Sequence, residues 1–246
     1  MIIGLLTAAC SSASATTAPP PRTEPEPPTL CQLERGLAPA SSWPAPTPAR
    51  EPRPSAPPDE TATASPDTGC TRHVDDLPSG RGATEADERR LHDSRVVVAD
   101  KSARRLMLFD AGTLQACWPI ALGFAPAGHK EVEGDGRTPE GWYALSDKPW
   151  SVFQDAIAIH YPATRDADDA LADGLIEASV HARVAAASRR GRLPPQRTAM
   201  GGEVLIHGGG TGRDWTLGCI ALADDDLRDL RSRLPDGMRS HLLVLP

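Results

Sequence analysis

Apolar residues gather in short runs that begin near residue 94 and continue to the C-terminus. Runs at 95–99 and 105–109 are separated by a polar turn, and a third run at 114–122 follows a second turn that contains Gly112. This order predicts an antiparallel meander of three strands. Further short strands are predicted at 142–145, 156–160, 204–206 and 241–245.

Helical spacing occurs in two places. Between residues 166 and 190, apolar side chains recur three and four positions apart, and Gly174 lies near the middle. Because glycine weakens a helix interior, this segment predicts either one helix or two shorter ones. Residues 224–233 predict another helix. The folded part is therefore expected to be mostly β with short helices.

The N-terminal third has a different composition. Of the 25 prolines, 16 precede residue 80, and this Pro-, Ala-, Thr- and Ser-rich stretch has almost no periodic apolar residues. Such a segment cannot bury enough apolar surface to offset the entropy lost on ordering. We therefore predict a disordered spacer at 11–93 and one folded domain at 94–246.

Residues 1–10 form a short apolar run that ends in small residues and Cys10. This order resembles the end of a bacterial lipoprotein signal and predicts a lipid on Cys10. The alternative is an ordinary secretory signal cleaved near Ala9 or Ala15. Both interpretations predict export to the periplasm or cell envelope. No other stretch is long and apolar enough to span a bilayer, so a membrane partner is expected only through this lipid.

Charge and metal-ligand spacing exclude several classes of protein. The net charge of −7 argues against a nucleic-acid partner, and the Arg-rich segment 183–197 has no interleaved aromatic residues. The chain has no C-x-x-C or H-E-x-x-H motif, and no second histidine lies beside Cys219. We therefore expect no metal site.

The other cysteines allow two expectations. An oxidising compartment would permit a disulfide between Cys31 and Cys70, which flank the Pro-rich spacer, although nothing in the sequence brings them together. Cys117 lies in an alternating run of strand type, so a buried and unreactive thiol is expected there.

One short glycine-rich loop carries His207 at its beginning and Cys219 at its end. A thiol becomes a strong nucleophile as a thiolate, and a nearby imidazole can remove its proton. The pair therefore predicts an acyl-transfer site. The string His-Gly-Gly-Gly also occurs in α/β-hydrolases, but the G-x-S-x-G element that accompanies it there is absent. Neither glycine pattern completes a dinucleotide fingerprint or a P-loop.

Three motifs in this order resemble the YkuD-type L,D-transpeptidase catalytic domain over residues 94–246. They are Gly136-Arg-Thr-Pro-x-Gly-x-Tyr143, Ile206-His207-Gly208 and Thr216-x-Gly218-Cys219-Ile220. The segments at 159–162 and 194–202 resemble a periplasmic branch of this family. The resemblance implies a mostly β, sandwich-like catalytic fold outside the cytoplasmic membrane. It also implies action on peptidoglycan stem peptides without a cofactor.

The resemblance assigns roles by position. Cys219 is expected to be the nucleophile and His207 the general base, with the carbonyl of Gly208 orienting the imidazole. The backbone N–H groups of Gly218 and Cys219 are expected to form the oxyanion hole. Thr216 is expected either to bind substrate or to stabilise the turn.

Other family positions are less specific. Tyr143, His160 and Tyr161 match positions near the substrate cleft in sequence order, and a core or rim role is the alternative for each. Leu217 stands where the commoner family pattern has a second histidine, and Ala221 stands where it has Arg or Asn. These two departures bear on the balance between transfer and hydrolysis.

The expected reaction forms a thioester on Cys219 with loss of a terminal D-alanine. The acyl group then passes to an amine on a neighbouring stem peptide or on an envelope lipoprotein. Two alternatives remain open. Water could accept the acyl group, which would make the protein a hydrolase, or the chain could be a catalytically silent envelope lipoprotein that binds peptidoglycan.

Overall fold

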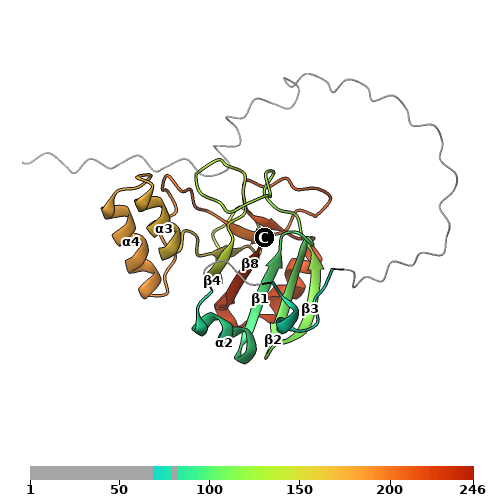
Figure 1. Cartoon of the computed structure of the whole chain (residues 1–246). Helices are drawn as coiled ribbons and strands as arrows, with labels where there is room; N and C mark the ends of the chain where they lie inside the picture. Colours follow the sequence, from blue (N-terminus) through green and yellow to red (C-terminus); the bar gives the residue numbers. More distant parts are fainter. Residues whose placement is uncertain (1–68, 79–82) are drawn as a thin grey trace, which may run out of the picture. The chain divides into compact units, whose positions relative to one another are not determined.

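The structure is a computed structural model that describes residues 69–78 and 83–246 (Figure 1). It contains every strand that the apolar pattern predicts. These are β1 Arg95–Asp100, β2 Arg105–Asp110, β3 Thr113–Pro119, β4 Gly141–Asp147, β5 Ile157–Ile159, β6 Leu205–His207 and β8 His241–Leu245. One further strand, β7 at Ile220–Ala221, has only two residues and was not predicted.

The helices follow the expected spacing with one addition. The predicted segment 166–190 is two helices, and Gly174 lies between them with a φ of +71° that favours glycine. The helix predicted at 224–233 is confirmed. The elements are η2 Val74–Asp76, α2 Glu85–Asp93, α3 Thr164–Ala172, α4 Ala178–Arg189, α5 Asp224–Arg233 and η3 Asp236–Met238. No helix in the described part of the chain is long and apolar enough to cross a membrane.

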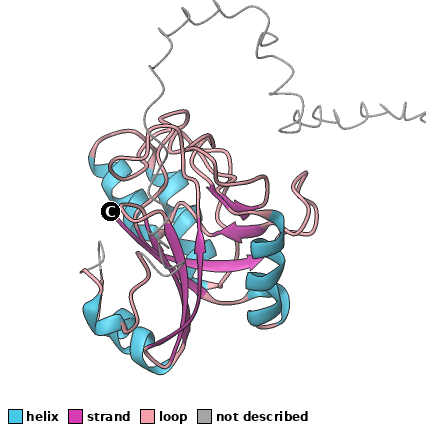
Figure 2. Cartoon of the chain, turned by 90° about the vertical axis from the view of Figure 1, so that its right-hand side faces the viewer, coloured by secondary structure: helices cyan, strands magenta, loops and turns pink. Residues whose placement is uncertain are grey.

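The strands form one strongly curled sheet in the order β3-β2-β1-β8-β4-β5-β6-β7. The first three strands are the predicted antiparallel meander, and β8 lies parallel to β1 on its other side. Just after β3, Ala121 exchanges two backbone hydrogen bonds of 2.9 and 2.8 Å with Ala221 of β7. The two ends of the strand order therefore meet. Figure 2 shows that the long strands cross the direction of the short ones.

Both faces of β1 and β2 are buried, which explains their continuous apolar runs, whereas most residues of β3 are half-buried or exposed. Val97 and Leu108 face the main core, which also contains the inner residues of β4, β5 and β6. Val96 and Phe109 face a second cluster, which includes Val74 and Leu91 from the N-terminal segment. The outer face of the meander is thus covered by residues that precede the predicted domain.

Helix α2 corrects the boundary that the sequence placed at residue 94. Thr84 caps this helix, because its side chain accepts a hydrogen bond from Asp87 N–H (3.2 Å) and its own N–H donates to the Asp87 carboxylate (3.0 Å). Leu91 is then buried against the sheet. The prediction of a spacer at 11–93 is therefore wrong for residues 69–78 and 83–93. Residues 11–68, with Cys31, and the predicted lipidation site Cys10 lie outside the described residues.

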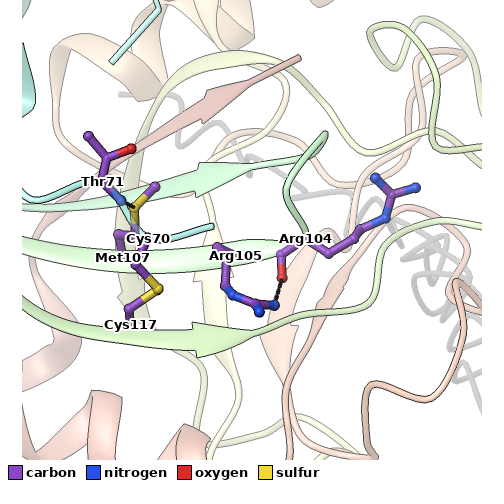
Figure 3. Close-up of a disulfide and its surroundings, with 6 residues drawn as sticks. All are labelled: Cys70, Thr71, Arg104, Arg105, Met107 and Cys117. Atoms are coloured by element: carbon purple, nitrogen blue, oxygen red, sulfur yellow. Dashed lines mark hydrogen bonds between the residues drawn. A yellow bond between two sulfur atoms is a disulfide. The ribbon is translucent and has the colours of Figure 1, made fainter. Parts of the chain in front are cut away.

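A disulfide joins Cys70 to Cys117 of β3 (Figure 3). The prediction that Cys117 is a free buried thiol is therefore wrong, and Cys70 is not available to pair with Cys31. The segment next to the disulfide also contacts β2, because Thr71 N–H lies 3.3 Å from Met107 Sδ. The bond attaches the N-terminal segment to the edge strand of the sheet.

Candidate active site

Strands β6 and β7 bring the two ends of the glycine-rich loop together. They are parallel neighbours, and Ile206 pairs with Ile220 while His207 pairs with Ala221. Cys219 directly precedes β7 and therefore lies beside Leu205, whose N–H donates to Cys219 Sγ at 3.4 Å. The pairing of two short strands thus places a thiol next to a strand that ends in an imidazole.

The imidazole of His207 is enclosed and oriented. Its Nδ1 lies 2.5 Å from the carbonyl oxygen of Gly208, so Nδ1 carries the proton and Nε2 is left as the basic nitrogen. The ring stacks on Phe153 with centroids 4.0 Å apart and meets the edge of Trp215 at 5.5 Å. His207 is only 1% exposed, and this burial lowers the pKa of its imidazole against the opposing effect of the Gly208 carbonyl.

The loop around His207 is fixed by the start of α5. A Cβ on Gly208 would lie 2.1 Å from Asp224 Oδ1, so the close approach of this carboxylate requires glycine. The same oxygen accepts a hydrogen bond from Gly209 N–H at 2.9 Å. Asp224 is therefore a structural partner of the loop, and the sequence pattern had placed it only in a helix.

The thiol of Cys219 makes two hydrogen bonds. Its Sγ accepts from Leu205 N–H and donates to the carbonyl oxygen of Glu203 at 3.6 Å. In the described part of the chain, these two are the hydrogen bonds that its thiol makes, and neither involves His207. Cys219 is half-buried, and burial raises the pKa of its thiol to about 11. At pH 7 the thiol is therefore protonated in this arrangement.

Thr216 and Gly218 hold the turn before the thiol. Thr216 Oγ1 accepts a hydrogen bond from Gly218 N–H at 3.1 Å and donates one to the Cys219 carbonyl at 2.8 Å. This geometry fits the turn-stabilising role for Thr216. The sequence predicts the N–H groups of Gly218 and Cys219 as oxyanion donors. Gly218 N–H is engaged in the turn, so only Cys219 N–H is left for this role. Gly218 has a φ of +131°, and a Cβ there would lie 2.6 Å from the Arg137 carbonyl.

Three predicted substrate residues have hydrogen-bond partners outside this loop. The Tyr143 hydroxyl donates to the Glu140 carbonyl at 3.0 Å, and the Tyr161 hydroxyl donates to the Met200 carbonyl at 3.1 Å, both inside the core. His160 pairs with Ser146 Oγ at 2.9 Å and lines a separate cavity of about 310 Å³. Burial lowers the pKa of His160 to about 4. All three positions fit the core or rim alternative.

Two buried lysines near the thiol were missed by the sequence analysis. Lys130 Nζ pairs with Asp135 at 2.9 Å, and Lys148 Nζ pairs with the carboxylate of Glu203. Both ammonium groups favour the charged form of the Cys219 thiol. Nothing in the local sequence distinguishes them from exposed lysines, because their burial depends on loops that meet only in the fold.

Metal ligation finds no support in residues 69–78 and 83–246. No group of three or more His, Cys, Asp and Glu side chains there could hold an ion. The arrangement instead offers a thiol, a neutral imidazole and a free backbone donor. These are the groups that thiol-dependent acyl transfer uses.

Comparison with known proteins identifies the family. The YkuD model, the L,D-transpeptidase catalytic domain, matches residues 94–242. The chain therefore belongs to the YkuD family of L,D-transpeptidase catalytic domains, and its mostly β fold is the fold of that family. A sequence search finds no match among curated proteins.

Several solved structures are similar to this chain. The helical cell shape determining protein Pgp2 from Campylobacter jejuni is 22% identical, with a TM-score of 0.41 over 61% of this chain and 47% of Pgp2. Bd1075 from Bdellovibrio bacteriovorus is 20% identical, with a TM-score of 0.39 over 66% of this chain and 49% of Bd1075. An L,D-transpeptidase from Mycobacterium smegmatis is 17% identical, with a TM-score of 0.34 over 62% and 59%. The matched region spans about half of Pgp2 and Bd1075.

Proposed function

We propose that this protein is a cysteine-dependent acyltransferase that acts on peptidoglycan stem peptides, with Cys219 as nucleophile and His207 as general base. The observation that carries the proposal is the β6–β7 pairing, which brings the thiol beside the strand that presents the imidazole. Membership of the L,D-transpeptidase catalytic family supports the substrate class. The hydrogen bond to Gly208 supports His207 as a base, because it leaves Nε2 free to accept a proton.

The first half-reaction consumes a tetrapeptide stem. The thiol turns from Glu203 toward the substrate, His207 Nε2 takes its proton, and Sγ attacks the carbonyl carbon of the third residue. Cys219 N–H donates to the developing oxyanion. The bond to the terminal D-alanine then breaks, and the proton on His207 passes to the leaving amine. The products are a thioester on Cys219 and free D-alanine.

The second half-reaction transfers the acyl group. An amine attacks the thioester carbonyl, gives its proton to His207 and displaces the Cys219 thiolate, which is then reprotonated. An amine on a neighbouring stem gives a crosslink, and an amine on an envelope lipoprotein gives a protein attachment. Leu217 is 64% exposed next to the nucleophile, where the common pattern has an imidazole. An apolar side chain there does not activate water, so we propose an amine rather than water as acceptor.

A catalytically silent peptidoglycan-binding protein is the second candidate. The observation that favours it is the resting state of Cys219, whose thiol is protonated and hydrogen-bonded to Glu203 rather than to His207. The two functions differ in one respect that can be measured. Only the enzyme releases D-alanine.

Release of D-alanine from disaccharide tetrapeptide by the purified chain tests the proposal. We expect the wild type to release D-alanine, with loss of this activity in Cys219→Ala and a strong reduction in His207→Gln. The matched control is His181→Gln, which removes a histidine of α4 that pairs with Asp168. Release by none of the proteins, with peptide binding retained, would favour the silent binding protein.

Export belongs to the same proposal, because the substrate lies outside the cytoplasmic membrane. We propose a signal at 1–10, a tether at 11–68, and a lipid on Cys10 as the membrane attachment. Mass spectrometry of the mature N-terminus tests this. A lipid-modified Cys10 is expected, and an unmodified terminus at another residue would contradict the anchor.

A further inference from the structure

An ion pair between a buried lysine and a partly exposed glutamate lies near the proposed nucleophile. Lys148 follows the last residue of β4, and its side chain is 5% exposed. Its ammonium group pairs with the carboxylate of Glu203, a residue 55 positions later in the chain. Burial of a lysine requires a partner, because an isolated ammonium group loses its hydration. Glu203 is that partner, and its backbone in turn contacts Cys219.

Glu203 has an unusual backbone conformation. Its φ is +56°, in the left-handed region that a residue with a Cβ adopts only at a cost in free energy. Two contacts hold it there: its N–H donates to Gln196 Oε1 at 2.9 Å, and its carboxylate is pinned by Lys148. In this conformation its carbonyl oxygen accepts the hydrogen bond from the Cys219 thiol at 3.6 Å. Glu203 therefore connects Lys148 to the Cys219 thiol, because its carboxylate contacts one and its carbonyl oxygen contacts the other.

We propose that Lys148 is a positioning residue for the acyl-transfer reaction, and that it acts through Glu203 to set the orientation and the charge environment of Cys219. This inference rests on the proposed function only where it concerns the rate of acyl transfer. The contacts themselves predict how the thiol reacts with any small electrophile.

The charges that face the thiol have opposite signs. Lys148 and Lys130 favour the thiolate, Glu203 opposes it, and His207 on the neighbouring strand is neutral at pH 7. Lys148 therefore acts twice, because it attracts the thiolate directly and neutralises the carboxylate that would repel it. Loss of Lys148 would leave Glu203 as an uncompensated negative charge beside Cys219.

The test measures the rate at which iodoacetamide alkylates Cys219 in the folded full-length chain between pH 7 and pH 10. Peptide mass spectrometry separates Cys219 from the other thiols. Lys148→Met keeps the length of the side chain but removes the charge, and we expect alkylation to slow by about tenfold or more at each pH, the effect of one unit in thiol pKa. Lys148→Arg should restore most of the rate.

Variants at Glu203 give the opposite sign. Glu203→Gln removes the repelling charge and leaves Lys148 in place, so alkylation should become faster than in the wild type. The double variant Lys148→Met/Glu203→Gln should lie between the two single variants. Opposite directions from the two halves of one ion pair are not expected from general damage to the fold.

A buried Lys–Glu pair elsewhere in the fold provides the control. Lys101 Nζ lies 2.7 Å from Glu140 Oε1, and neither side chain is among the charges that act most strongly on the thiol. Lys101→Met should lower the thermal midpoint of unfolding but leave the alkylation profile of Cys219 unchanged.

The outcomes separate the two proposals. Equal alkylation rates in wild type, Lys148→Met and Glu203→Gln would overturn the positioning role, even if Cys219→Ala abolishes D-alanine release. The predicted shifts without D-alanine release from the wild type would instead support Lys148 as a positioning residue and contradict the enzyme. If Lys148→Met fails to fold, the faster alkylation of Glu203→Gln still decides the question.

Discussion

Removal of the Cys70–Cys117 disulfide should destabilise the domain substantially. The bond joins positions 47 residues apart. In the chain-entropy account, a crosslink of this span removes about 14 cal/mol/K from the unfolded state, or about 4 kcal/mol at 25 °C. The double variant Cys70→Ala/Cys117→Ala should therefore lose about 2–4 kcal/mol of unfolding free energy, the usual range for native disulfides.

The loss of unfolding free energy also depends on how firmly the N-terminal segment is held by its other contacts. Val74 is buried in the second cluster, its N–H donates to the Gly112 carbonyl at 3.1 Å, and Leu114 N–H donates to the Arg72 carbonyl at 3.0 Å. If these few contacts open before the rest of the sheet, part of the crosslink's effect is lost, because the segment is then already free. Hydrogen exchange at Val74 and Leu114 should accordingly accelerate in the double variant.

Urea unfolding, followed by tryptophan fluorescence, measures the effect. Wild type and the double variant are compared with Cys31→Ala, which removes a cysteine that the disulfide does not use. Cys31→Ala should unfold as the wild type does. The reasoning is refuted if the double variant is within about 0.5 kcal/mol of wild type, the scatter of neutral substitutions. A loss in Cys31→Ala as large as that in the double variant would also refute it.

Three further predictions concern the candidate active site. Phe153→Ala exposes His207 and should raise its lowered pKa toward 6.5, so the acid limb of kcat/KM should move to higher pH; an unchanged limb would contradict this. Thr216→Val removes both hydrogen bonds of the turn and should cost about 1–3 kcal/mol in urea unfolding, whereas wild-type stability would argue against a structural role. Gly218→Ala, with a backbone carbonyl 2.6 Å from the new Cβ, should displace the thiol and reduce D-alanine release at least about tenfold, the effect of a 1.4 kcal/mol misplacement. Gly212→Ala, where a Cβ meets nothing, is its control, and equal activity of the two variants would contradict the prediction.

The strand framework was predictable because periodicity carries it. Every strand of three residues or more follows from an apolar run, and α5 and β8 have the expected bounds. The two-residue strand β7 is too short to leave a periodic signal. Helix α2 was missed for a similar reason, because it buries only Leu91 and has no apolar periodicity. Its start depends on a cap between Thr84 and Asp87, which is hard to recognise in a polar segment.

The candidate site was predictable only in part. His207 and Cys219 could be proposed from the sequence because glycines and motif order mark their loop. The partner of Cys117 could not be derived, because Cys70 reaches the edge strand through a segment that looked like spacer. The ion pair of Lys148 and Glu203 likewise joins positions 55 residues apart, which no local pattern relates.

The most direct test of the central claim is mass spectrometry of the enzyme after brief incubation with disaccharide tetrapeptide and an acid quench. Acyl transfer predicts an adduct on the peptide that carries Cys219, formed together with free D-alanine and lost when an amine acceptor is added. Cys219→Ala should show neither the adduct nor free D-alanine. D-alanine release that persists in Cys219→Ala, or a wild-type protein that forms no adduct and releases no D-alanine, would contradict the account.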